Sequence, residues 1–427
     1  MMEDANQDII VIGLLYGDET KGATVDWLAS RKRPETVVRF SGGPQTAHNV
    51  MTPAGEHHTF AMFGSASFQQ IPTILTRFTL INPFNLVKEG DVLYDKTGWN
   101  PFAGLQISEN ALLITPMHVW LNRKREEARG DNPHGSCGEG IGETQLYKLN
   151  HPGSELIMAD LLPSNSDRLE TKLSKLLVYI QEQANEVYHP TVHELMNEYS
   201  AMMTSGLLNI VPDEQLTTVI STGYHVFEGS QGVLLDEDQG FHPHTTWSTV
   251  TSQNAQVLLE EAGKPAGFVL GVLRSYMTRH GAGPFNSEIP DTAENTLMFP
   301  EPHNQWGRYQ GSWRRGWLDL PALEYASRAT KGVDAFMLSH CDLITPNMKT
   351  VTSYKNWTPI PTGFYGQDFD RKEVFTKTKL EPITLLDAET TLTPNVEAIT
   401  ELVEGTLQAP LYGTSHGPTR DDRLSVE

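Results

Sequence analysis

The sequence has little cysteine and no long hydrophobic segment. Its two cysteines, Cys137 and Cys341, are too few for a disulfide framework or a cysteine-based zinc cluster, which favours a reducing compartment. No apolar run approaches the roughly 20 residues that a membrane-spanning helix needs. The first residues, Met-Met-Glu-Asp-Ala-Asn, are acidic and lack the apolar region of a secretion signal. We therefore expect a cytoplasmic protein that does not enter a membrane.

Basic residues are also scarce. The 427 residues include 32 Lys and Arg against 53 Asp and Glu, which gives a formal net charge of −21 at pH 7. A chain this acidic is not expected to bind nucleic acid or an anionic membrane over a broad surface. A small anionic ligand is not excluded, because local donors rather than the net charge decide its binding.

No low-complexity linker, internal repeat or heptad pattern divides the chain. Short apolar runs alternate with helical patterns, which is typical of a mainly parallel sheet covered on both faces. We predict one α/β domain over residues 1–427, with helical and loop insertions. The predicted strands are 9–13, 36–40, 111–115, 222–228, 268–273 and 335–338, and the predicted helices are 23–31, 119–129, 167–187, 254–262 and 320–329.

The most informative segment is the loop Gly17-Asp18-Glu19-Thr20-Lys21-Gly22, between the first predicted strand and the first predicted helix. Backbone N–H groups and the positive end of a helix can cradle a phosphate, and a lysine adds charge. The order differs from the G-x-x-x-x-G-K-[ST] loop, because Gly22 follows Lys21. An acid beside a phosphate repels it unless a cation intervenes or the acid does chemistry. Asp18 thus indicates phosphoryl transfer with a metal and a built-in base; a plain strand-to-helix turn is the alternative.

Nine segments stand in order along most of the chain: 17–22, 38–48, 128–130, 135–142, 227–232, 278–285, 316–319, 339–342 and 415–418. Together they resemble the adenylosuccinate synthetase family. The resemblance implies the P-loop-NTPase-like adenylosuccinate synthetase fold, with a large central sheet flanked by helices. It also implies a homodimer with active sites near the subunit interface.

The resemblance implies a ligase that joins L-aspartate to C6 of a 6-oxopurine nucleotide, with Mg²⁺ and with ATP or GTP as phosphoryl donor. A lactam oxygen is a poor leaving group, so it is phosphorylated before the amine of aspartate displaces it. By resemblance, Asp18 removes the N1 proton and binds Mg²⁺ together with the carbonyl of Ala47. His48 is the general acid beside the transferring phosphoryl group, and Lys21 neutralises the donor phosphates.

The same resemblance implies binding residues for each substrate, and for each of them an ordinary structural role is the alternative. The substrate nucleotide is expected at Asp18, Gln45, Ser136, Cys137, Gln231 and Thr246; aspartate at Gly311, Ser312, Arg314 and Arg315; and the donor triphosphate at Gly17, Glu19, Thr20, Lys21, Gly22, Asn49, His340, Asp342, Ser415, Gly417 and Pro418.

The chain departs from the family pattern mainly at binding positions, which makes ATP credible as a donor beside GTP. The departures are Thr20 and Ala47 in place of glycines, Ser312 in place of an arginine in an aspartate loop one residue shorter, Glu139 in place of an arginine, His340 in place of a lysine, and His151 or Lys148 where a partner-subunit arginine would lie.

This pattern resembles the diverged viral branch of the family, which converts dGMP to the succino precursor of 2-aminoadenine nucleotides. Guanine shares the N1–H and C6=O of hypoxanthine, so the same mechanism applies. We predict dGMP as the favoured substrate and, if the chain is viral, the host cytoplasm as its location. Some members of that branch have serine in place of Asp18, so IMP is the first alternative. The second is a non-catalytic nucleotide-binding sensor, which the joint presence of Asp18, Lys21 and His48 argues against.

Overall fold

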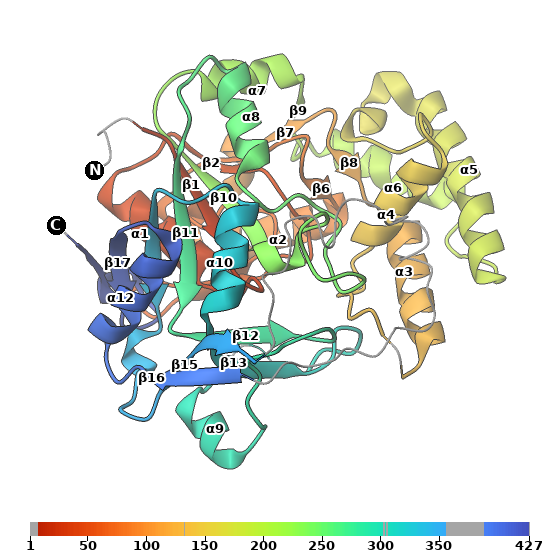
Figure 1. The fold of residues 1–427 in the computed structure, drawn as a ribbon. Coiled ribbons are helices and arrows are strands. Elements are labelled where there is room, and N and C mark those ends of the chain that lie inside the picture. Colours follow the sequence, from red (N-terminus) through yellow and green to blue (C-terminus); the bar gives the residue numbers. More distant parts are fainter. Residues whose placement is uncertain (1–6, 132, 302–303, 305, 356–387, 427) are drawn as a thin grey trace.

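The computed structural model describes residues 7–131, 133–301, 304, 306–355 and 388–426. A ten-stranded sheet runs through its centre (Figure 1). Every neighbouring pair of strands is parallel except the pair at one edge, which is antiparallel. In spatial order the strands are β18 (Arg423–Ser425), β17 (Leu411–Ser415), β14 (Ala335–Ser339), β11 (Phe268–Arg274), β1 (Ile9–Gly13), β10 (His225–Gly232), β2 (Thr36–Arg39), β5 (Thr73–Leu75), β7 (Gln106–Ser108) and β9 (Ile210–Val211).

Helices surround this sheet and extend beyond one side of it, away from the two chain ends (Figure 1). Within the described ranges, no helix is long and apolar enough to cross a membrane. The helices are α1 (Lys21–Arg31), α2 (Pro83–Thr97), α3 (Pro116–Arg129), α4 (Ile141–Asn150), α5 (Ser166–Ala184), α6 (Val192–Thr204), α7 (Asp213–Ile220), α8 (Gln253–Glu261), α9 (Ala293–Met298), α10 (Leu320–Ala329) and α12 (Val396–Leu407).

The central strand β1 shows why the sheet is covered on both faces. Its five residues are all buried, as in a strand that packs on both sides. Ile10 and Ile12 share a hydrophobic cluster with residues of α8, α10 and α12, whereas Ile9 and Val11 share another with residues of α1. Because successive side chains of a strand point to opposite faces, each cluster covers one face. The predicted α/β class with a large, mainly parallel sheet is confirmed.

A smaller sheet lies near the carboxyl ends of the central strands, at the bottom of Figure 1. Its first strand begins two residues after β11 ends, so the chain runs directly from one sheet into the other. A separate hairpin carries His48 at its first residue. The small sheet contains β12 (Tyr276–His280), β13 (Trp313–Asp319), β15 (Lys349–Tyr354) and β16 (Ala388–Leu392), and the hairpin contains β3 (His48–Met51) and β4 (His57–Phe60).

Two predicted strands need correction. Of the segment 111–115, only β8 (Leu112–Leu113) is a strand, and it pairs with β6 (Leu80–Ile81) outside the central sheet. The reason is that Thr115 already caps α3, accepting a hydrogen bond from the backbone N–H of His118. Strand β10 begins three residues later than predicted and continues to Gly232, so the glycine-rich segment lies within the strand rather than after it.

Candidate active site

Two cavities meet beyond the carboxyl end of β1. The smaller cavity has a volume of about 270 Å³, and the larger cavity has a volume of about 360 Å³. Between them lie the β1–α1 loop and the start of the β3–β4 hairpin. The residues that line both cavities are Gly17, Asp18, Ala47, His48 and Asn304.

The residues predicted for the substrate nucleotide and those predicted for the donor line different cavities. All six residues predicted for the substrate nucleotide line the smaller cavity. Ten of the eleven predicted for the donor line the larger cavity; the exception is Glu19. Residues that lie hundreds of positions apart in the sequence thus meet in the groups that the resemblance implied.

Glu19 supports the loop from behind. Its side chain is 3% exposed, and its Oε1 accepts hydrogen bonds from the backbone N–H groups of Leu15 (3.0 Å) and Gly17 (2.8 Å). Burial raises the pKa of the Glu19 carboxyl to about 7. Gly17 has a φ of +107°, and a Cβ there would lie 2.8 Å from the Cα of Gln231, so only glycine fits. Glu19 therefore shapes the phosphate loop and does not line the larger cavity.

Lys21 and Asp18 place opposite charges on the loop. Lys21 begins α1, and its Nζ donates a 2.5 Å hydrogen bond to the carbonyl of Gly17. Burial raises the pKa of Asp18, while the positive charges of Arg274 and Lys21 oppose the rise. Asp18 at the junction is therefore a stronger base than an exposed aspartate, and it can reach ligands in both cavities.

His48 is oriented by a buried carboxylate. Its Nδ1 lies 2.6 Å from Oε1 of Glu228, and Glu228 also accepts hydrogen bonds from the backbone and hydroxyl of Ser65. Burial acts to raise the pKa of Glu228, but the charge of Arg39 and the bonds from His48 and Ser65 outweigh it, leaving a pKa of about 2. Because Glu228 is ionised, Nδ1 of His48 carries the proton. Its Nε2 is buried and has no partner among the described residues.

Sequence reasoning assigned no role to several charged residues of the site, among them Glu228, Arg274 and Arg423. Glu228 lies in a segment that carried the resemblance, but its pairing with His48 depends on residues 180 positions apart. Arg274 ends the apolar strand β11, lines the larger cavity and donates to the backbone carbonyl of Asp18. The position of Arg274 at the end of an apolar strand is a signal from which sequence analysis could have identified it as a site residue. Arg423 also lines the larger cavity, is 5% exposed and pairs with Ser415 across β18 and β17.

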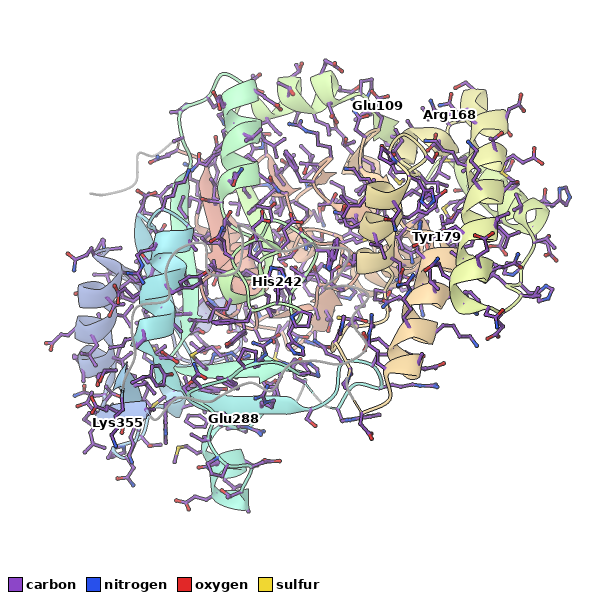
Figure 2. All side chains as sticks on the ribbon, turned by 45° about the vertical axis from the view of Figure 1, so that its right-hand side comes forward. Glu109, Arg168, Tyr179, His242, Glu288 and Lys355 are labelled. Carbon is purple, nitrogen blue, oxygen red and sulfur yellow. The ribbon has the colours of Figure 1, made fainter. Side chains whose placement is uncertain are left out.

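The predicted aspartate-binding residues line neither cavity. Arg314 is held by both carboxylate oxygens of Glu288, at 2.8 and 2.5 Å, and by the carbonyls of Gly281 and Gly283. Figure 2 shows Glu288 beside the small sheet. Arg315 donates to the carbonyl of Phe299. Their role in binding aspartate stays a prediction. The full set is Gly311, Ser312, Arg314 and Arg315.

Two of the positions that depart from the family pattern have partners of their own. His151 stacks on Tyr147 at 4.6 Å and contacts the ring of Tyr179 at 5.0 Å, so it packs against its own chain (Tyr179 is labelled in Figure 2). Glu139 accepts a 2.9 Å hydrogen bond from Asn85. Burial lowers the pKa of His340 well below its ordinary value, so the imidazole does not supply the charge of a lysine.

A magnesium ion fits the junction only together with phosphates. The described residues contain no group of three or more His, Cys, Asp or Glu side chains able to hold a metal alone. Mg²⁺ in nucleotide sites typically uses one or two carboxylates, phosphate oxygens and waters. Asp18 supplies a carboxylate, and the backbone of Ala47 lines the same junction. This donor set is compatible with Mg²⁺ bound to a triphosphate.

A strand, a glycine-bearing loop and a helix that open onto two adjoining cavities form an arrangement typical of enzymes of phosphoryl transfer. The adenylosuccinate synthetase family model matches residues 10–424. The adenylosuccinate synthetase of Limosilactobacillus reuteri is 30% identical to this chain, and the match covers 81% of this chain and 80% of that protein. The adenylosuccinate synthetase of Buchnera aphidicola is 28% identical, and the match covers 99% of each chain. The chain belongs to the adenylosuccinate synthetase family and is a carbon–nitrogen ligase.

Two solved structures share the fold. The fully ligated adenylosuccinate synthetase of Plasmodium falciparum has a TM-score of 0.79 at 18% identity and covers 99% of this chain and 100% of its own. The succinoaminodeoxyadenylate synthetase (PurZ) of cyanophage S-2L, bound to dGMP and to dATP as an energy donor, has a TM-score of 0.63 at 15% identity, with 98% and 95% covered. At identities this low, the likeness to these two structures shows a shared fold and nothing more.

Proposed function

We propose that this chain couples L-aspartate to C6 of dGMP while it hydrolyses ATP or GTP, and that it forms N6-succino-2-amino-2'-deoxyadenylate. The observation that carries the proposal is the junction of the two cavities, where Asp18 and His48 touch both. One carboxylate there can reach a nucleotide in the smaller cavity and a phosphate chain in the larger.

The placement of Asp18 and His48 supports the mechanism that the family resemblance implies. Asp18 takes the N1 proton of the base, which makes O6 nucleophilic, and O6 attacks the terminal phosphorus of the donor, releasing the diphosphate. Lys21 supplies positive charge to the donor phosphates, and a Mg²⁺ ion held by Asp18 and the carbonyl of Ala47 would add to it when bound. The amine of aspartate then attacks C6, loses a proton, and inorganic phosphate leaves with the former O6.

His48 acts beside the transferring group. Burial lowers the pKa of its imidazole to about 4, against the raising effect of Glu228. An anionic phosphate chain beside Nε2 favours the protonated ring, since opposite charges stabilise each other. We infer that His48 gains its second proton when the donor binds and then donates a hydrogen bond from Nε2 to the transferring group.

The choice of dGMP has its own support. A 2-amino group needs an acceptor, and the Oε1 atoms of Gln45 and Gln231 are buried in the smaller cavity without a partner among the described residues. A cyanophage enzyme of the same fold binds dGMP. The second candidate is IMP, because the relatives by sequence are adenylosuccinate synthetases.

The test is product formation with purified protein, aspartate and Mg²⁺. IMP, dIMP, GMP and dGMP are crossed with ATP and GTP, and phosphate release and product mass are measured. Succinylated product from dGMP alone supports the proposal, whereas product from IMP alone refutes the choice of base. Binding without turnover for every pair supports a sensor instead.

The remaining features follow the family. We propose that residues 1–427 form one domain, that the protein is a homodimer, and that it works in the cytoplasm, or in the host cytoplasm if viral. Light scattering behind size exclusion measures the assembly; a monomer at working concentration refutes the dimer.

A further inference from the structure

Thr20 has a backbone conformation that threonine avoids. Its φ of 66° and ψ of 27° lie in the left-handed region, where a β-branched residue is an outlier because its Cβ substituents crowd the backbone. Seven described residues other than glycine have a positive φ, and Thr20 is the one β-branched residue among them. Glycine would adopt this conformation without strain.

The hydroxyl of Thr20 does not compensate for this strain within the chain. Thr20 is the N-cap of α1, where threonine normally accepts a hydrogen bond from the first turn, but its side chain makes no such bond. Its Oγ1 is buried and has no partner among the described residues. A buried hydroxyl without a partner is unfavourable. Two unfavourable features at one residue indicate a ligand that compensates for them.

The position of Thr20 identifies the kind of ligand. Thr20 lines the larger cavity between Asp18 and Lys21, at the amino end of α1. The buried side chains of Lys21 and Arg274 line the same cavity and add positive charge. The amino end of a helix, two cationic side chains and a hydroxyl without a partner all favour a phosphate oxygen as the ligand group.

We propose that Thr20 Oγ1 donates a hydrogen bond to an oxygen of the donor's phosphate chain, and that this bond accounts for a threonine at a left-handed position. The inference rests on the proposed function only in taking a triphosphate as the ligand of the larger cavity. It makes Thr20 a binding residue through its side chain, beyond the backbone of the loop.

The test separates stability from binding. Thr20→Gly removes both the strain and the hydroxyl, so we expect a higher melting temperature without ligand and a dissociation constant for a non-hydrolysable triphosphate that rises roughly tenfold, as for one hydrogen bond to a charged group. Thr20→Ser keeps the hydroxyl and should bind within about threefold of the wild type. Calorimetry gives the constants for the ATP and GTP analogues.

Lys331→Gly is the matched control. Lys331 also has a positive φ, of 62°, but it is exposed and lines neither cavity. This variant should also melt higher while it binds the triphosphate like the wild type. A Thr20→Gly protein that melts higher and binds the triphosphate unchanged overturns the inference, and so does a Thr20→Ser protein that binds as weakly as Thr20→Gly. If the wild type itself binds neither analogue, the donor assignment in the proposed function fails first.

Discussion

Replacing Glu228 by Gln tests how the site holds His48. The carboxylate of Glu228 is fully buried and accepts from His48 Nδ1 at 2.6 Å and from the backbone of Ser65 at 2.9 Å. Glutamine has the same shape but carries one acceptor oxygen and one NH₂ group. Either the N–H of His48 or that of Ser65 must therefore face the NH₂ group, which is itself a donor. The charge that balances Arg39 is lost as well.

The expected loss of folding stability can be worked out from the pKa of Glu228. Its value of about 2, against an ordinary 4.5, corresponds to about 3 kcal/mol in favour of the folded, ionised form at neutral pH. Because the folded pKa is lowered, this stability is present above the unfolded pKa and is lost as the pH falls through about 4.5 to 2. We expect Glu228→Gln to unfold about 3 kcal/mol more easily at pH 7, with a shallower loss of stability on the acid side.

The effect on catalysis is larger than the effect on binding. Without the carboxylate, the tautomer and orientation of His48 are no longer fixed, and we expect kcat to fall by roughly a hundredfold or more, with nucleotide dissociation constants within about threefold. Urea unfolding at several pH values, steady-state kinetics and calorimetry measure these quantities. Ser65→Ala is the control, because it removes one neutral donor and leaves the charge. A Glu228→Gln enzyme with wild-type kcat and unchanged acid unfolding refutes the reasoning.

Three further substitutions probe other parts of the site. Asp18→Asn should abolish turnover and leave nucleotide binding largely intact, since an amide cannot take the N1 proton; residual turnover above one per cent or so would argue for another base. Arg423→Met should raise KM for the donor roughly tenfold while KM for the substrate nucleotide stays within about twofold; the reverse pattern contradicts its place in the larger cavity. Burial raises the pKa of Glu19 to about 7, so the folded state disfavours its ionised form, and the penalty grows as the pH rises from about 4.5 to 7. Glu19→Gln should therefore melt higher than the wild type at about pH 8 but not at about pH 5, and equal shifts at both pH values contradict this account.

The phosphate loop could be predicted from the sequence because it is a short contiguous motif. The two groups of cavity-lining residues are scattered along the chain, and the resemblance of several short motifs to one family supplied them. Lys21, Asp342 and Thr246 line the expected cavities without any information on pairing between distant segments. The central strands were predictable for a related reason: a strand buried on both faces, such as β1, is apolar throughout.

What the sequence did not reveal depends on contacts between distant residues. The ion pair of Glu228 with His48 and the contact of Arg274 with the backbone of Asp18 join different strands and loops. Arg314 shows the same dependence: its motif predicts an aspartate-binding residue, whereas the fold sets the partners that it has in this structure, Glu288 and two backbone carbonyls. A local pattern gives the chemistry of a side chain, whereas its partner is set by the fold.

The residues that line both cavities include Asp18 and His48, which are proposed for the chemistry, whereas most residues proposed to choose a ligand line one cavity. Five residues touch both cavities, and every other lining residue touches one. Under the proposed assignment of the two cavities, a change at Gln45 or Thr246 is expected to affect the choice of substrate nucleotide, and one at His340 or Arg423 the choice of donor, while Asp18 and His48 are left unchanged. This division would let a protein engineer exchange one ligand at a time and keep the reaction.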